Sequence, residues 1–252
     1  MNIKKLNYNQ KRKIMFASIA IILLLFTILG CVSIIYILYG EALLTSQKTQ
    51  LKKAEEYAAI ASSTPQNGVV FVGDSIFELY DLKKWFKDKD YINRGISSNK
   101  SEDVLNRLQT NVIDLKPSVV IIHVGTNDIG HNIPNEKYIA NMDKIINQLQ
   151  TQLPNCTIIV DSIYPTVTLN SYNSKNLTKV RENSTINNTN IALKYLCKTK
   201  KVIYLDTHNS LLLDDKLNKT YTIDGLHLSD SGYNIVTREI TNQLNYIVSK
   251  KK

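Results

Sequence analysis

The pattern of hydrophobic and polar positions first sets apart one long apolar segment near the N-terminus. Residues 14–39, IMFASIAIILLLFTILGCVSIIYILY, contain no charged side chain. As a helix, this segment would be about 39 Å long, enough to cross a hydrocarbon core of about 30 Å. A helix that is apolar on every side has no face for water, which disfavours a buried core helix in a soluble protein. The pattern therefore predicts a transmembrane helix.

The next part of the chain has the composition of a connecting segment. Residues 41–63, EALLTSQKTQLKKAEEYAAIASS, are rich in alanine and other helix formers and predict a helical or loose stalk. The sequence TPQNG at 64–68 then marks a boundary. We predict four parts in chain order: a basic tail at 1–13, an anchor at 14–39, a stalk or linker at 40–66 and one domain at 67–250.

Within this domain, short apolar runs alternate with segments of helical periodicity. The run SVVIIHV at 118–124 is almost continuously apolar, as is typical of a central parallel strand covered on both faces. The alternation predicts a parallel α/β sheet with helices on both faces. The predicted strands are 69–72, 91–92, 118–124, 156–163 and 201–206, and the predicted helices are 101–115, 136–151, 178–198 and 232–248.

Charge adds the orientation of the anchor. The formal net charge is +9, and five basic residues before residue 14 leave only +4 for the rest of the chain. A basic balance concentrated in one short tail is a poor indication of nucleic-acid binding, and we expect no nucleic-acid partner. Because basic residues flank transmembrane helices on the cytoplasmic side, we predict a single-pass membrane protein with a cytoplasmic N-terminus and an extracellular domain.

Two alternatives to an uncleaved anchor involve processing. A cleaved signal peptide is disfavoured, because its apolar region has only about 7–15 residues. The sequence ILGC at 28–31 loosely resembles a lipoprotein cleavage box, although Leu29 fits it poorly, so a lipoprotein anchored at Cys31 is the alternative. Two further cysteines, Cys156 and Cys197, would lie outside the membrane, and their spacing leaves open whether they pair.

Candidate catalytic residues lie where the predicted strands end. Ser75 follows the first strand, Arg94-Gly95 follows the second, and GTND at 125–128 follows the third. The carboxyl ends of parallel strands meet at one edge of the sheet, where ligands bind. Ser75 is therefore either the N-cap of a helix or a nucleophile placed at a binding edge.

A serine nucleophile needs a base, an acid that orients the base, and donors for the oxyanion. His227 lies three residues after Asp224 in TIDGLHLSDSGY, a spacing that can bring the carboxylate to the imidazole Nδ1 and leave Nε2 for the serine. Asn127 offers a side-chain amide, while Gly95 and Ser75 offer backbone N–H groups. The other histidines are not spaced as metal ligands, and His123, inside an apolar strand, is predicted to be a core residue.

Together these segments resemble the four blocks of the GDSL, or SGNH, hydrolase family. The resemblance implies a flavodoxin-like three-layer α/β/α fold and a serine esterase that needs no metal or other cofactor. It makes Ser75 the nucleophile, His227 the general base and Asp224 its orienting acid, with an oxyanion hole from Ser75, Gly95 and Asn127. The blocks are Gly73-Asp74-Ser75, Gly95 in NRGIS, Gly125-Thr126-Asn127-Asp128 and Asp224-Gly225-Leu226-His227.

The sequence departs from the family pattern at two points. The first block reads GDSI, with Ile76 in place of leucine. The second block often carries another glycine a few residues further on, whereas this chain reads GISSNK. The second departure concerns the rim of the site and therefore the substrate.

Three functions remain open from the sequence. The first is an outward-facing serine esterase that forms an acyl-enzyme on a small ester, such as the O-acetyl groups of cell-wall or surface glycans. The second is a lysophospholipase or thioesterase that acts on lipid acyl groups. The third is a non-catalytic surface module that binds a glycan or a partner. Residues 166–190 are polar and of low complexity, and we interpret them as either a loop over the site or a surface excursion.

Overall fold

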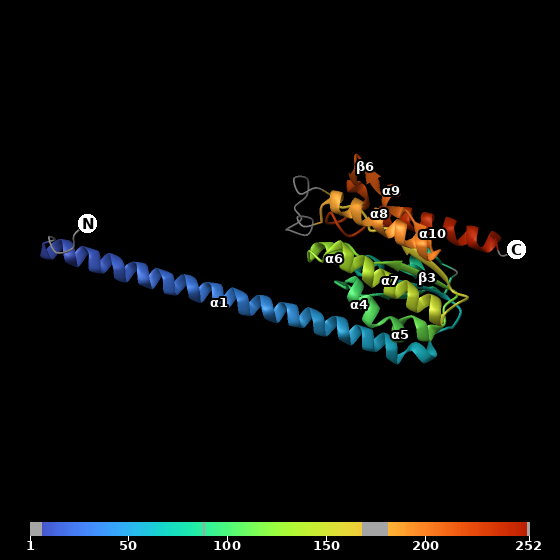
Figure 1. Cartoon of the computed structure of the whole chain (residues 1–252), viewed down its shortest axis with the longest axis horizontal. Coiled ribbons are helices and arrows are strands. Elements are labelled where there is room, and N and C mark those ends of the chain that lie inside the picture. The colour runs from blue at the N-terminus through green and yellow to red at the C-terminus, as the bar shows by residue number, and fades with distance from the viewer. Residues whose placement is uncertain (1–6, 88, 168–180, 251–252) are drawn as a thin grey trace. The chain divides into compact units, whose positions relative to one another are not determined.

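The computed structural model describes residues 7–87, 89–167 and 181–250. Helix α1 (Tyr8–Ala59) begins the described chain (Figure 1). It is the one helix in the described part of the chain that is long and apolar enough to cross a membrane. The chain divides into two compact units, Met1–Thr49 and Gln50–Lys252, so the last turns of α1 belong to the second unit.

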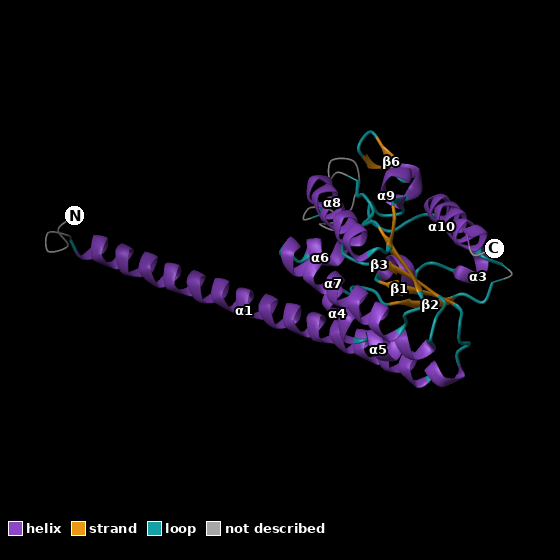
Figure 2. Ribbon diagram, turned by 45° about the vertical axis from the view of Figure 1, so that its right-hand side comes forward, coloured by secondary structure: helices purple, strands orange, loops and turns teal. Residues whose placement is uncertain are grey.

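The second unit is built around a parallel five-stranded sheet, as the sequence predicts (Figure 2). The strand order β2-β1-β3-β4-β5 is that of flavodoxin-like sheets, in which the crevice between β1 and β3 is the ligand-binding position. The strands are β1 (Val69–Gly73), β2 (Ile92–Gly95), β3 (Val119–His123), β4 (Thr157–Asp161) and β5 (Ile203–Leu205).

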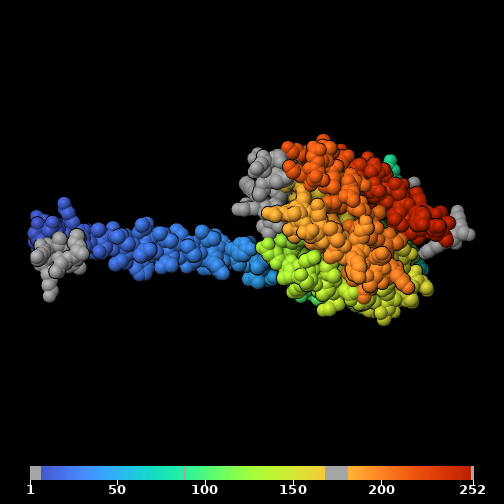
Figure 3. Space-filling view, turned by 45° about the horizontal axis from the view of Figure 1, so that its top comes forward, coloured from blue at the N-terminus to red at the C-terminus, as the bar shows by residue number. Residues whose placement is uncertain are grey.

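Helices cover both faces of this sheet and form two hydrophobic cores. One core contains Val70, Val120 and Ile122 beneath α4, α5, α7 and α8, and α7 and α8 lie side by side on the surface in Figure 3. The other core contains Phe71 and Ile121 beneath α2, α3 and α10. Alternate residues of the central strands thus face opposite layers, as their continuous apolar runs require. The helices are α2 (Ser75–Glu78), α3 (Leu82–Trp85), α4 (Ser101–Asn106), α5 (Leu108–Asn111), α6 (Thr126–Gly130), α7 (Asn135–Gln152), α8 (Asn183–Lys200), α9 (Thr207–Ser210) and α10 (Asp230–Lys250); a hairpin of β6 (Leu212–Leu213) and β7 (Lys216–Leu217) precedes α10.

Three predicted elements differ clearly from the structure. The strand predicted at 91–92 is β2 (Ile92–Gly95), so Arg94 and Gly95 lie in the strand and do not follow it. The helix predicted at 101–115 is divided into α4, α5 and a 3-10 turn at Ile113–Leu115. The first break lies at Arg107, whose side chain enters the domain and donates to Gly73 O at 3.0 Å. The stalk predicted at 40–66 is helical as far as Ala59, and its part from Gln50 onward is grouped with the domain.

Sheet register places the candidate blocks at one level. Gly73 of β1 pairs with Gly95 of β2 and with His123 of β3, so the segments that follow these residues leave the sheet together. A Cβ atom on Gly73 would lie 1.9 Å from His123 O, and one on Gly95 would lie 2.2 Å from Glu78 N. Close backbone packing therefore requires glycine at both positions.

Two buried carboxyl groups make the stability of this domain sensitive to pH. Asp74 is fully buried after β1, and Asp161 is 1% exposed at the end of β4. Burial raises the pKa of each to about 7, although hydrogen bonds from neighbouring groups oppose the shift. At pH 5 to 6 the unfolded chain has released these protons while the folded chain keeps them. Raising the pH through this range therefore lowers the free energy of unfolding.

Asp161→Asn is expected to remove part of this dependence. The amide oxygen still accepts the hydrogen bond that Tyr164 Oη donates at 2.6 Å, but the group no longer titrates. The loss of stability between about pH 4.5 and 6.5 becomes shallower by up to about 1.4 kcal/mol per pH unit. Urea unfolding of the detergent-solubilised chain, followed by fluorescence of its single tryptophan, Trp85, measures this slope. The exposed Asp90→Asn serves as control, and identical slopes in all three proteins would contradict the prediction.

Candidate active site

The structure brings Ser75, His227 and Asp224 into one hydrogen-bonded series. Ser75 is the first residue of α2, and its Oγ lies 3.0 Å from His227 Nε2. His227 Nδ1 lies 2.6 Å from Asp224 Oδ2. Because the carboxylate accepts the proton on Nδ1, the lone pair of Nε2 faces the serine hydroxyl. The arrangement is that of a serine nucleophile with an oriented general base.

A short closed loop holds the acid and the base. The backbones of Thr222 and Leu228 form an antiparallel bridge across its ends. Inside the loop, Asp224 Oδ1 accepts from Leu226 N at 2.9 Å and from His227 N at 2.7 Å. The three-residue spacing thus lets one carboxyl group fix the loop through Oδ1 and the imidazole through Oδ2.

The same contacts set the charge of Asp224. Partial burial disfavours its ionised form, but hydrogen bonds from the His227 side chain and from the His227 and Leu226 backbones outweigh burial. The pKa of Asp224 is therefore below its ordinary value. An ionised carboxylate at neutral pH stabilises the imidazolium that forms when His227 takes a proton.

Asp74, rather than Ser75, caps α2. Asp74 Oδ1 accepts from Ile76 N at 3.0 Å, as expected of an N-cap side chain. The Ser75 hydroxyl is directed to His227 instead. The Ser75 N–H has no acceptor among the described residues, so it remains available to a substrate oxygen.

Asn127 lies in the first turn of α6 with its amide held from both sides. Its Oδ1 accepts from Arg181 Nη2 at 3.1 Å, and its Nδ2 donates to Asn99 O at 3.1 Å. A guanidinium only donates and a carbonyl only accepts, so these partners determine which way the amide is turned. Among the described residues, the second N–H of Asn127 Nδ2 has no acceptor and remains for an oxyanion.

The expected donor Gly95 is engaged elsewhere, and this corrects its predicted position in the oxyanion hole. Its N–H donates to Asn93 Oδ1 at 2.8 Å. The Asn93 side chain folds back at the end of β2, where its Nδ2 also donates to Phe77 O at 2.5 Å. Further along the loop, Ser98 is exposed with a left-handed φ of 64°, in the segment where the family often has a second glycine. Its N–H has no acceptor within the described part of the chain.

Two arginines that sequence reasoning missed organise the surroundings. Arg107 is 7% exposed and donates to Asn99 Oδ1 at 2.7 Å as well as to Gly73 O. Arg181 donates to Thr126 O at 2.9 Å in addition to its contact with Asn127. Arg107 interrupts the apolar stripe of the helix predicted at 101–115, which is a usable signal. Nothing in the sequence around Arg181 identifies its role.

Three other residues of the candidate blocks and strands, His123, Arg94 and Asp128, are buried inside the domain. His123 is 1% exposed, packs on Phe77 and Tyr164, and has a pKa lowered to about 3 by burial, which confirms the predicted core histidine. Arg94 is 4% exposed, and its guanidinium lies 4.7 Å from the centre of the Tyr57 ring. Asp128 accepts from Ser101 Oγ at 2.5 Å and thereby fixes the start of α4.

The sequence predictions also concern the cysteines, the possible metal ligands and the segment 166–190. Cys156 and Cys197 do not form a disulfide, and within the described ranges no three His, Cys, Asp or Glu residues are grouped to hold a metal ion. Of the segment 166–190, Thr166 and Val167 are buried and Asn183 begins α8, while residues 168–180 lie outside the described residues.

Comparison with known proteins agrees with this geometry. Residues 71–235 match the GDSL-like Lipase/Acylhydrolase family. The chain is 30% identical over 179 residues to the GDSL esterase/lipase WDL1 of Oryza sativa subsp. japonica, which covers 67% of this chain and 68% of the relative.

Two solved bacterial structures are also similar. One, from Streptococcus pneumoniae and described as a candidate platelet activating factor, is 29% identical with a TM-score of 0.74 over 79% of this chain and 94% of the other. A GDSL-like lipase from Bacteroides thetaiotaomicron VPI-5482 is 25% identical with a TM-score of 0.67 over 77% and 98%. The chain therefore belongs to the GDSL-like lipase/acylhydrolase family.

Proposed function

We propose that the chain is a membrane-anchored serine esterase whose nucleophile is Ser75. The observation that carries this proposal is the relay in which Ser75 Oγ lies 3.0 Å from His227 Nε2 and His227 Nδ1 lies 2.6 Å from Asp224 Oδ2. Asp74 caps the helix, so capping does not account for the position of the Ser75 hydroxyl. Membership of an acylhydrolase family supports ester hydrolysis as the reaction.

The reaction follows from these contacts. Ser75 Oγ attacks the ester carbonyl carbon while His227 Nε2 takes the hydroxyl proton. The oxyanion accepts hydrogen bonds from Ser75 N–H and the remaining N–H of Asn127 Nδ2. The tetrahedral intermediate collapses, the C–O bond to the alcohol breaks, and His227 returns the proton to the departing alcohol. Water, deprotonated by His227, then attacks the acyl-enzyme and releases the acid with restored Ser75.

We place the substrate among short acyl esters outside the membrane, with O-acetyl groups of cell-wall or surface glycans as the first choice. The amide of the oxyanion donor Asn127 is flanked by the Arg181 guanidinium and the Asn99 backbone oxygen, and these polar neighbours favour a small acyl group over a long apolar one. Residues 14–39 act as the anchor in this proposal, with the basic residues before them in the cytoplasm. Lipid attachment at Cys31 is the alternative form of anchoring.

One labelling experiment tests both the chemistry and the location. Intact cells that express the chain are treated with a fluorophosphonate probe that does not cross membranes, and the modified peptide is identified by mass spectrometry. We expect modification at Ser75 to the same extent in intact and lysed cells. Labelling only after lysis would contradict the outward orientation. A folded protein that is not labelled would favour the non-catalytic binding module.

The acyl preference is measured on the purified chain with p-nitrophenyl esters of increasing length. We expect the acetate to be hydrolysed fastest and the rate to fall beyond about four carbons. A maximum at long chains would replace the glycan esterase with the lysophospholipase or thioesterase alternative.

A further inference from the structure

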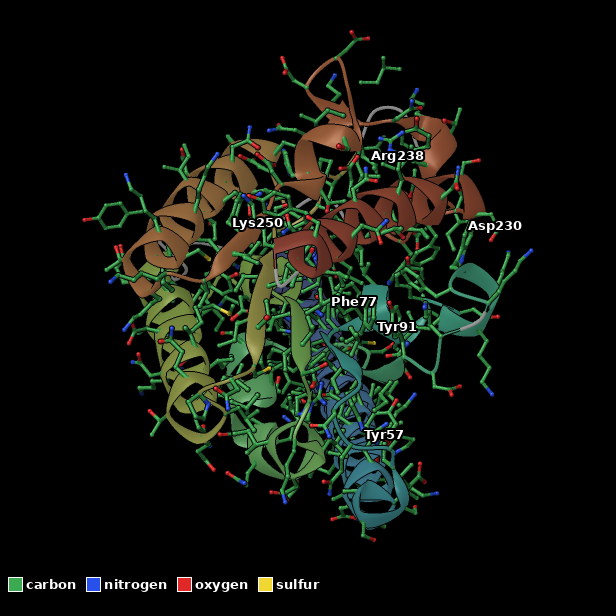
Figure 4. All side chains as sticks on the ribbon, turned by 90° about the vertical axis from the view of Figure 1, so that its right-hand side faces the viewer. Tyr57, Phe77, Tyr91, Asp230, Arg238 and Lys250 are labelled. Carbon is green, nitrogen blue, oxygen red and sulfur yellow. The ribbon has the colours of Figure 1, made fainter. Side chains whose placement is uncertain are left out.

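The last turns of α1 lie directly against the end of β2 and the loop that follows it. Tyr57 Oη donates to Gly95 O at 3.2 Å, and Gln50 Oε1 accepts from Asn99 Nδ2 at 3.1 Å. Both α1 side chains are half-buried in the domain, and Figure 4 labels Tyr57 at this end of the helix. Because these two contacts reach both ends of residues 95–99, α1 holds the loop rather than passing beside it.

A third contact joins α1 to the helix that carries the nucleophile. Lys53 Nζ forms an ion pair with Glu78 Oε1, and Glu78 Oε2 accepts from the backbone N–H of Ser97. Burial disfavours ionisation of Glu78, but these two hydrogen bonds outweigh burial and lower its pKa. Glu78 belongs to α2, which begins at Ser75. One ionised carboxylate thus connects α1, α2 and the loop.

The loop in turn positions Asn127. The backbone oxygen of Asn99 accepts from Asn127 Nδ2. The Asn99 side chain donates to Gln50 Oε1 and accepts from the buried Arg107. Asn99 is 2% exposed, so few other partners are within its reach. The series from Gln50 through Asn99 to Asn127 connects α1 to an oxyanion donor. A displacement of about 1 Å at such a donor can lower the rate about 10²-fold.

We propose that Gln50, Lys53 and Tyr57 are positioning residues of the active site, which makes the end of the anchor-bearing helix part of the catalytic apparatus. They act through residues 95–99 on Asn127, and none of them touches the substrate. This inference rests on the proposed esterase function. It adds that the segment predicted to be a helical or loose stalk sets the geometry of the oxyanion hole.

The test uses the full chain in mild detergent with p-nitrophenyl acetate. Gln50→Ala, Lys53→Met and Tyr57→Phe are each expected to lower kcat about 3- to 10-fold, and the triple variant about 10²-fold, with KM within twofold of wild type. Inactivation by a fluorophosphonate should slow by the same factors. Lys53→Arg keeps the ion pair with Glu78 and should retain kcat within twofold. Glu55→Gln, at an exposed position on the same turn, is the matched control.

Three outcomes would overturn the inference. Unchanged kcat in the triple variant would show that α1 does not position the site. A fall in kcat that is matched by the unfolded fraction, measured by Trp85 fluorescence, would reduce the contacts to a stabilising role. A wild-type chain without turnover would overturn the proposed function and this inference with it. If the wild type is active, the proposed function stands, and the variants test the positioning role of α1 alone.

Discussion

Ser75→Ala is expected to lower kcat for p-nitrophenyl acetate by about 10⁴- to 10⁶-fold and to abolish labelling by a fluorophosphonate. The variant keeps the backbone N–H at position 75, the Asn127 amide and the loop 222–228, so substrate binding and the oxyanion contacts persist. What it lacks is the oxygen 3.0 Å from His227 Nε2, and without that oxygen no acyl-enzyme forms. The residual rate is that of a bound ester exposed to water.

The control for this variant is a serine away from the site. Ser249 lies near the end of α10, and its exposed hydroxyl donates to Tyr246 O at 2.8 Å. Ser249→Ala should keep wild-type kcat and labelling. Turnover within tenfold of wild type in Ser75→Ala, from a preparation free of contaminating esterase, would remove Ser75 from the mechanism.

Asp224→Asn is expected to lower kcat about 10⁴-fold at neutral pH. The asparagine oxygen can still accept from the backbone N–H groups of Leu226 and His227, so the loop keeps its shape. The amide nitrogen then faces His227 Nδ1 and donates to it, which places the imidazole proton on Nε2. A protonated Nε2 cannot take the proton of Ser75, and no carboxylate stabilises the imidazolium.

Stability measurements separate this effect from a loss of folding. Asp224 has a lowered pKa in the folded chain, so its ionised form stabilises the protein above about pH 4, and this contribution is lost as the pH falls through the folded pKa. The stability difference between wild type and Asp224→Asn should therefore shrink in acid, while the kinetic defect at pH 7 remains. Asp230→Asn, which removes only the exposed ion pair with Lys84, should retain activity. If Asp224→Asn keeps kcat within tenfold, another group orients His227.

The sequence predicts the sheet and the series of Ser75, His227 and Asp224 because each depends on a local pattern. The β-branched runs at 69–72 and 118–124 predict buried parallel strands, and the sheet order then brings their carboxyl ends together. Asp224 and His227 are three residues apart, so their pairing needs only one turn. Ser75 joins them because it follows a strand whose position the alternation of elements already determines.

The remaining contacts depend on tertiary packing that no local pattern encodes. Gly95 was expected to present its N–H, but the neighbouring Asn93 side chain folds back and accepts it. Arg181 reaches Asn127 from a segment 54 residues away. In α1, the half-buried Lys53 and Tyr57 share a face with the small residues Ala54 and Ala58, whereas Lys52 and Glu56 are exposed, so the docked face lacks large apolar side chains. Polar contacts of this kind become visible only with the structure.

The long separation within the relay has a consequence for biosynthesis. Ser75 and His227 are 152 residues apart, whereas His227 and Asp224 share one closed loop. In the proposed mechanism, the ribosome therefore makes the nucleophile long before its base, and a nascent chain that ends before residue 227 has an unactivated serine. We expect ester cleavage only after nearly the whole domain has been translated, so truncated products should be catalytically silent.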